Sequence, residues 1–125
     1  MTRAESLSFR LSWMALLLTG LATLVFGVVV VILRSPEEQY LRAIGAASIG
    51  MGLFGAAITV TAFRRCERWA YVALWYYPVF WTAHLVGNLP PGQDHIHQVV
   101  FIVLSLLGLL LPIGAFFPRA VSPRK

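Results

Sequence analysis

The spacing of the charged residues is the feature that most constrains this chain. Four stretches contain no Asp, Glu, Lys or Arg: 11–33, 43–63, 69–93 and 95–118. Each is longer than the ~18 apolar residues that mark a candidate membrane-spanning helix. Only 12% of the residues are charged and the mean hydropathy is +0.76, whereas a soluble domain carries about 25% charged residues. We therefore predict an all-α integral membrane protein with no soluble domain.

The connections between these stretches are short. Removing turn residues and flanks leaves one domain over 1–125 with expected spans of about 11–33, 40–63, 69–88 and 97–117. Short connections make sequential helices antiparallel neighbours, and the NLPPGQDH segment carries the Pro-Pro-Gly signature of a reversal. The first apolar core exceeds the 7–15 residues of a signal peptide, so we expect it to remain a helix. The prediction is an up-down-up-down four-helix bundle.

The basic residues predict the orientation of this bundle. Eight of the ten fall on one side of the expected membrane: Arg3, Arg10, Arg64, Arg65, Arg68, Arg119, Arg124 and Lys125. Arg34 and Arg42 fall on the other side. The positive-inside rule then places both termini in the cytoplasm, in a multi-pass protein of the inner (plasma) membrane. Topology and contact with anionic lipid account for the net charge of +5, so this charge does not point to nucleic acid.

A helix-start signal follows the first span. Ser35 suits an N-cap, Pro36 the first helical position and Glu38 the third, which together form a capping box. The second helix is therefore expected to begin outside the membrane and to enter it near Tyr40. Glu38 and Arg42 are four residues apart and are expected to pair on its surface.

Small residues recur at intervals of four in the first two spans. They are Ala15, Thr19, Thr23 and Gly27 in the first, and Ser48, Gly52 and Ala56, with Gly45 and Gly55 nearby, in the second. Small side chains let helices approach closely in lipid, so we predict that these two stripes pack together. The alternative is that Gly and Ala are simply common in membrane helices.

The third span contains the segment WYYPVFWTAH, which concentrates aromatic and polar groups. One helix face collects Tyr77, Trp81, His84 and Asn88, at positions i, i+4, i+7 and i+11. Lipid offers no partner to the hydrogen-bonding group of any of them, so this face is expected to point into the bundle, a cavity or a partner protein. Pro78 should release the carbonyl of Leu74 and kink the helix, and Pro112 in the fourth span should free that of Gly108.

Two interpretations of this polar face remain open. One is a pocket open to the outer leaflet, lined by Tyr77, Trp81, His84, Asn88, Arg42 and His97. Aromatic walls with a few polar tips suit a quinone, a lipid or a haem. The other is that these groups bond one another, hold the helices in register, or form an interface with a partner.

Metal binding is a further alternative, because DHIH supplies Asp94, His95 and His97 within four residues. Imidazole and carboxylate ligands suit Zn or Cu, but an external loop can hold histidines without binding metal, so we predict no metal site. Ligation of haem by His84 and His97 would require the two imidazoles to share one depth, and counting along the helices places them about a turn apart.

Several activities conflict with the sequence. All five acidic residues lie outside the expected spans or at their ends, whereas a proton-coupled exporter normally needs a carboxylate within the membrane. No HExxH, Walker or GxSxG motif occurs, and the single Cys66 lacks the CxxC pattern of thiol redox work. An isomerase or reductase would need an acid–base pair such as His84 with Asp94. We therefore expect a protein that is not an enzyme.

The segments YLRAIGAASIGMGLFG and RRCERWAYVALWYYPVFWTAH resemble the second and third helices of small bacterial membrane proteins of the DoxX-like type. The similar features are an Arg then a Gly entering the second helix, an Arg-rich inner turn, and a proline halfway along an aromatic helix. This resemblance implies a four-helix membrane protein without an established activity, and it transfers no site residues.

The expected function is that of a non-catalytic accessory or assembly subunit of a membrane complex, or of a small homo-oligomer. The partner would be another membrane protein or a second copy, held through the aromatic helix or the small-residue stripes within the lipid bilayer. The alternative function is a binding protein for a quinone, lipid or haem in the external-leaflet pocket.

Overall fold

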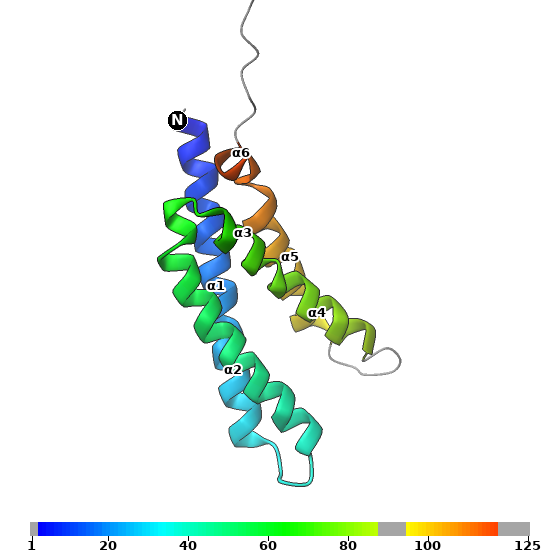
Figure 1. The fold of residues 1–125 in the computed structure, drawn as a ribbon. Helices are drawn as coiled ribbons and strands as arrows, with labels where there is room; N and C mark the ends of the chain where they lie inside the picture. Colours follow the sequence, from blue (N-terminus) through cyan, green and yellow to red (C-terminus); the bar gives the residue numbers. More distant parts are fainter. Residues whose placement is uncertain (1–2, 88–94, 118–125) are drawn as a thin grey trace, which may run out of the picture.

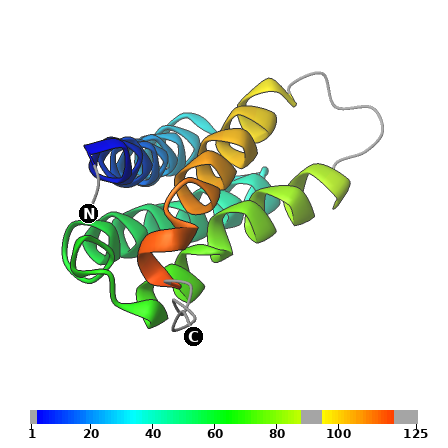
Figure 2. The same ribbon diagram turned by 90° about the horizontal axis from the view of Figure 1, so that it is seen from above.

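The computed structural model describes residues 3–87 and 95–117. Its elements in chain order are α1 (Arg3–Leu33), α2 (Gln39–Val60), the 3-10 helix η1 (Phe63–Arg65), α3 (Arg68–Leu74), α4 (Tyr76–Gly87), α5 (Ile96–Leu110) and α6 (Ile113–Phe116). These two ranges contain no strand, which confirms the all-α prediction. Figure 1 shows two helical hairpins, one of α1 with α2 and one of α3–α4 with α5–α6, and Figure 2 shows them from above.

Two helical segments are long and apolar enough to cross a membrane. They are Leu7–Leu33, which is most of α1, and Gln39–Arg65, which is α2 continued through η1. The second hairpin covers the spans predicted over 69–88 and 97–117, each of which was expected to be disturbed at its proline. Each of these stretches is interrupted near its proline, and Ile96–Leu110 is a shorter apolar helix.

The interruption in the third span follows from Pro78. Proline has no N–H to donate to the carbonyl four residues earlier, which here belongs to Leu74. Helix α3 ends at Leu74 and α4 begins at Tyr76. Between them the N–H of Trp75 donates to the carbonyl of Val72 at 3.2 Å, which is the tighter pattern of a 3-10 turn. The predicted kink is therefore present, just before the proline.

Pro112 has the same effect in the fourth span and joins the two hairpins. Helix α5 ends at Leu110, and the freed carbonyl of Gly108 accepts a buried hydrogen bond from the hydroxyl of Ser12 on α1. A Cβ at Gly108 would lie 2.6 Å from Cγ of Leu16, so only glycine allows this approach. The proline thus exposes a carbonyl, and the neighbouring helix supplies its donor.

The small-residue stripes form the contact between α1 and α2. A Cβ at Gly52 would lie 2.5 Å from the backbone N of Leu24, and a Cβ at Gly27 would lie 2.5 Å from the carbonyl oxygen of Gly45. Thr19, Thr23 and Ser48 are fully buried in the same seam. The predicted packing of the two stripes is therefore confirmed, with backbone against backbone.

The hairpins meet at one end of the molecule and diverge toward the other. An aromatic cluster occupies the joined end, where Phe63 packs on Phe116 at a centroid distance of 4.8 Å and on Phe9 at 5.9 Å, while Tyr71 packs on Phe116 at 4.9 Å. From there the two hairpins separate toward the end of α1 and the end of α4 (Figure 1).

The start of α2 corrects the predicted capping box. The helix begins at Gln39, and Glu38 occupies the N-cap without a side-chain cap. Ser35 and Glu38 instead close a turn in which the N–H of Ser35 donates to the Glu38 carboxylate at 3.3 Å. Glu38 also pairs with Arg34 at 3.4 Å rather than with Arg42. Only one arm of the box forms because the chain from Ser35 to Glu38 turns before it becomes helical.

The glycines of α2 provide a matched stability test. Replacing Gly52 by Ala places a methyl group against the backbone of α1, so we expect a loss of ~1–3 kcal/mol in the free energy of unfolding. Replacing Gly50 by Ala meets no atom within 4 Å and should leave stability unchanged or raise it by up to ~1 kcal/mol through helix propensity. Thermal unfolding in detergent, followed by circular dichroism, measures both. Equal effects of the two changes would contradict the close packing.

Candidate functional site

The polar face predicted for the third span points into the protein at two of its positions. Tyr77 is 1% exposed and Trp81 is fully buried, while His84 is half-buried. Asn88 lies outside the described residues. The expectation that this face turns away from lipid therefore holds for Tyr77 and Trp81, and both side chains belong to the core between the hairpins.

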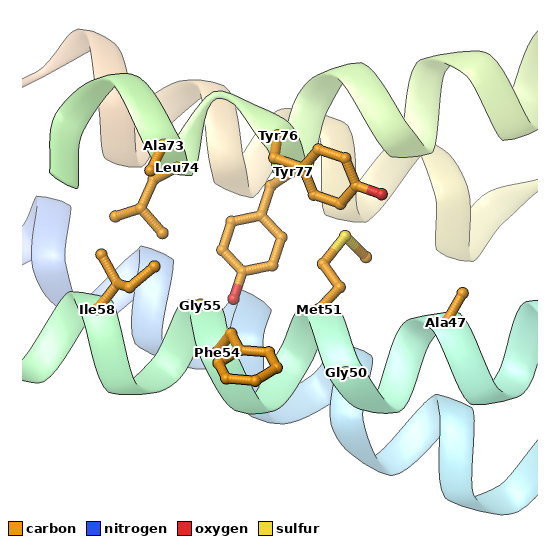
Figure 3. Close-up of a pocket in the computed structure, with 10 residues that line it drawn as sticks. All are labelled: Ala47, Gly50, Met51, Phe54, Gly55, Ile58, Ala73, Leu74, Tyr76 and Tyr77. Atoms are coloured by element: carbon orange, nitrogen blue, oxygen red, sulfur yellow. The ribbon is translucent and has the colours of Figure 1, made fainter. Parts of the chain in front are cut away.

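Tyr77 fills a notch made by two glycines of the first hairpin. A Cβ at Gly55 of α2 would lie 1.8 Å from the phenol oxygen, and a Cβ at Gly20 of α1 would lie 2.6 Å from it. Figure 3 shows the ring crossing from α4 to α2 with its hydroxyl against Gly55. No side chain larger than hydrogen fits at either glycine while the phenol occupies this position, so the notch anchors α4 on the first hairpin.

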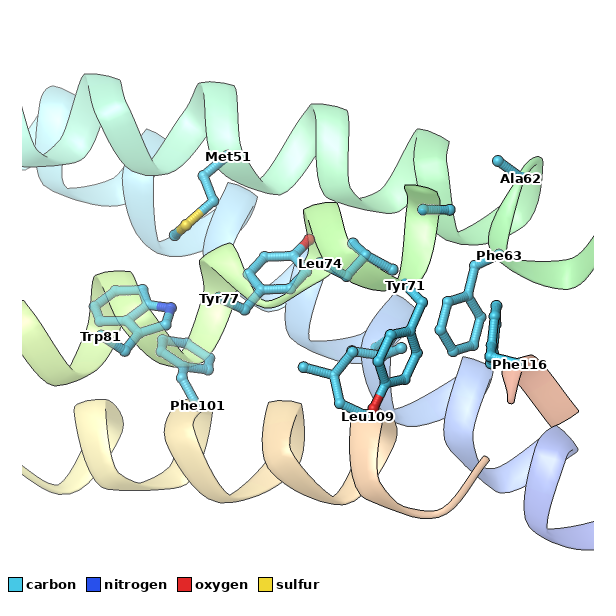
Figure 4. Packing of buried hydrophobic residues seen from close by; sticks show 12 residues of the cluster. Met51, Ala62, Phe63, Tyr71, Leu74, Tyr77, Trp81, Phe101, Leu109 and Phe116 are labelled. Atoms are coloured by element: carbon cyan, nitrogen blue, oxygen red, sulfur yellow. The ribbon is translucent and has the colours of Figure 1, made fainter. Parts of the chain in front are cut away.

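Trp81 is the centre of an aromatic and imidazole cluster one turn further along α4. Its ring lies 4.7 Å from that of Phe101 (Figure 4), and the rings of His84 and His97 lie 5.8 Å and 5.9 Å from it. His97 also stacks on Phe26 of α1 at 4.9 Å. The sequence placed the two imidazoles about a turn apart in depth, but the structure brings both against the same indole.

Arg42 does not join this cluster. It is exposed near the start of α2, on the hairpin that diverges from α4 toward this end of the molecule (Figure 1). The predicted pocket lining is therefore assembled in part: Trp81, His84 and His97 come together, Tyr77 lies one turn away, and Arg42 is separate. The prediction compared the depths of residues along each helix as if the helices were parallel. The two hairpins diverge, so residues at equal depth on different hairpins need not lie close together.

Several buried polar atoms have no hydrogen-bond partner among the described residues. They come from four helices and are Thr23 Oγ1, Ser48 Oγ, Tyr77 OH, Trp81 Nε1 and Gln98 Nε2. The interpretation that the aromatic face is held by internal hydrogen bonds is therefore not met at Tyr77 and Trp81, which pack through their rings. Gln98 was not among the predicted site residues, although an amide within an apolar span is itself a signal.

A groove lies beside Tyr77, between α2 and the α3–α4 kink. Its volume is about 380 Å³, within the range of small-molecule sites. The lining is almost wholly apolar and consists of Ala47, Gly50, Met51, Phe54, Gly55, Ile58, Ala73, Leu74, Tyr76 and Tyr77 (Figure 3). The groove lies along the middle of both segments, whereas the predicted pocket was at their external end, and it shares only Tyr77 with the predicted lining.

The candidate metal ligands are not gathered in the part of the chain that the structure describes. No group of three or more His, Cys, Asp or Glu side chains occurs there, and Asp94 lies outside it. His95 Nδ1 lies 3.5 Å from Oε1 of Gln98, and His97 is stacked on Phe26. These contacts give each of the two histidines a role in packing.

Outside the four expected membrane spans, two titratable groups of the described residues have shifted pKa values. Burial raises the pKa of the Cys66 thiol, which follows η1 in a left-handed backbone conformation (φ 58°). A backbone hydrogen bond, together with the Ser35 hydroxyl, lowers the pKa of Glu37. Burial thus favours the neutral thiol of Cys66 over its thiolate.

Comparison with known proteins assigns no family to this chain. No family model, curated protein or solved structure matches it. Its chemistry is therefore inferred from the geometry of the groove, of the buried donors and of the helix exteriors.

The buried phenol of Tyr77 gives a test of how α4 is held. Because its hydroxyl has no partner in the described structure, Tyr77→Phe removes an unsatisfied group that costs ~1–3 kcal/mol. We expect this variant to unfold at an equal or higher temperature in detergent. Tyr76 is exposed, so Tyr76→Phe is the matched control and should leave the unfolding temperature unchanged. A clear loss of stability in Tyr77→Phe alone would show that the hydroxyl has a partner.

Proposed function

We propose that this protein crosses the inner membrane four times, with both termini in the cytoplasm, and that it acts without catalysis. Its role is that of an accessory or assembly subunit of a membrane complex, or of a small homo-oligomer. This architecture is the one implied by the resemblance to DoxX-like membrane proteins.

The distribution of polar and apolar side chains carries this proposal. Ser12, Thr19, Thr23, Ser48, Thr59, Gln98 and Ser105 are all fully buried. Large apolar side chains cover the outside of both hairpins, with Phe54 69%, Val79 60% and Val103 49% exposed. Water would not favour so large an apolar exterior, whereas lipid favours it and leaves polar side chains to the helix contacts.

The second hairpin supports four crossings in spite of its breaks. Residues 68–87 and 96–116 would each extend ~30 Å at 1.5 Å per residue, which matches the hydrocarbon core of a bilayer. Proline breaks are accepted in membrane helices when a neighbour satisfies the freed backbone groups. The hydrogen bond from Ser12 to Gly108 supplies such a partner.

The outer face of α2 is the proposed site of association with a partner helix. The aromatic face and the stripes that the sequence suggested as interfaces are buried within the chain. Ala46 and Gly50, four residues apart on α2, lie outside that packing, and a Cβ at Gly50 would meet no atom within 4 Å. Small residues at this spacing let helices associate closely in lipid.

The groove supports a second candidate function, the binding of an amphiphile. Its apolar walls and the phenol of Tyr77 suit a quinone or a lipid chain. The residues that line it include no imidazole, so the groove offers no histidine ligand to a haem iron. A ligand would enter it sideways from the lipid, between α2 and the α3–α4 kink.

The single cysteine provides the test of topology. An impermeant maleimide should label Cys66 only after the membrane is permeabilised, because its loop is cytoplasmic in the proposal. In a Cys66→Ser background, Ser35→Cys should be labelled in intact cells. Since burial raises the pKa of the Cys66 thiol, its labelling rate at neutral pH should be below that of exposed Ser35→Cys and should rise with pH. Labelling of Cys66 in intact cells would refute the orientation.

Association through α2 is tested by added bulk at Ala46, which is exposed and, unlike Gly50, does not line the groove. We expect Ala46→Ile to weaken self-association or partner retention at least tenfold, measured by native mass spectrometry from mild detergent. Gly87→Ile is the control, because a Cβ at Gly87 meets no atom within 4 Å and lies at the end of α4. Equal retention in both variants would remove α2 as the interface.

The same spectra test the second candidate function. A stoichiometric small molecule should be lost when Ala47→Phe fills the groove and should be kept in the Gly87→Ile control. Wild-type protein that carries no such molecule would count against the groove as a ligand site.

A further inference from the structure

The joined end of the hairpins carries a concentration of positive charge. Arg10 of α1, Arg64 and Arg65 of η1, and Arg68 of α3 are all exposed there. The nearest acidic residue in sequence, Glu67, accepts a hydrogen bond from the indole N–H of Trp69. None of these four arginines forms an ion pair or hydrogen bond with another described residue. The charge of this end is therefore open to an anion.

Aromatic rings hold two of the guanidinium groups in place. Cζ of Arg64 lies 4.9 Å from the ring centroid of Trp13 on α1, and Cζ of Arg68 lies 5.6 Å from that of Phe117, just after α6. Stacking uses the faces of the guanidinium and leaves its N–H edges free to bind an oxyanion in a fork. The two groups are thus ordered before any anion arrives.

A groove of about 340 Å³ lies at the same end of the molecule. Its walls are the first turns of α1, the loop residue Cys66 and the junction of α5 with α6, and they include Phe9, Leu111 and Ala115. Cys66 separates Arg64 from Arg68 in the chain, so the groove adjoins the segment that carries both cations. Exposed arginines near a groove whose walls are partly apolar match the chemistry of an anionic amphiphile.

We propose that this end binds one anionic phospholipid of the cytoplasmic leaflet. Arg64 and Arg68 hold its phosphate, and one acyl chain lies in the groove against Phe9 and Leu111. Charge complementarity selects the headgroup, and the position of the groove between α1 and the α5–α6 junction makes the lipid a brace across the two hairpins. This inference rests on the proposed placement of the protein in a membrane.

The test uses the full chain released from mild detergent and analysed by native mass spectrometry with added lipid. We expect one phosphatidylglycerol to be retained at least tenfold better than phosphatidylcholine. The double variant Arg64→Gln/Arg68→Gln should lose this preference. The matched control, Arg34→Gln/Arg42→Gln, removes the same charge at the opposite end and should keep it. Equal losses in both variants would show attraction by net charge alone and would overturn the site.

Two further measurements separate the possible failures. Flotation with phosphatidylcholine vesicles after an alkaline wash tests membrane insertion by itself. A chain that washes off would overturn the membrane proposal, whereas a chain that floats but shows no lipid preference would overturn this inference alone. Arg64→Lys/Arg68→Lys keeps the charge without the planar fork, so we expect an intermediate preference. Full preference in this variant would refute the role of the stacked guanidinium groups.

Discussion

The hydrogen bond from the Ser12 hydroxyl to the carbonyl of Gly108 joins the two halves of this protein, and several other features depend on it. The carbonyl is available because Pro112 cannot donate to it. The donor reaches it because Gly108 has no side chain to hold Leu16 away. In lipid an open carbonyl costs several kcal/mol, so the proline break is stable only while α1 lies against α5. The junction thereby fixes which end of the hairpins is closed.

Glycines determine how the other helices pack, because they let the backbones of α1 and α2, and the ring of Tyr77, approach closely. Gly27 and Gly52 set the spacing of α1 and α2, and the notch of Gly20 and Gly55 receives the phenol of Tyr77. Tyr77 lies two residues after the break at Trp75, so the phenol anchors the first turn of α4 beside the kink. The central groove lies at this point, between α2 and the kink. The groove is therefore a consequence of the proline and the notch together.

Local patterns in the sequence predicted the features that depend on local chemistry. The helices, the two proline breaks and the packing of the small-residue stripes follow from charge-free runs, a missing N–H and spacing by four. The position of Arg42 relative to Trp81 could not be predicted in this way, because it depends on the angle between the hairpins. The prediction for the start of α2 was wrong for a related reason. Residues 35–38 can form either the first turn of the helix or a turn that precedes it, and the carboxylate of Glu38 pairs with Arg34 instead of Arg42.

The interior and the charged end of the molecule carry different kinds of polar group. The unpartnered buried groups, such as Trp81 Nε1 and Gln98 Nε2, are uncharged, and no Asp, Glu, Lys or Arg lies in 69–87 or 95–117. This interior therefore brings together neutral side chains, and the imidazoles of His84 and His97 lie against Trp81 without a carboxylate from these two ranges. Fixed charge is available at the exposed arginines of the joined end. In the proposed membrane placement, recognition is expected at these arginines and at the outer face of α2, and the aromatic core supports both surfaces.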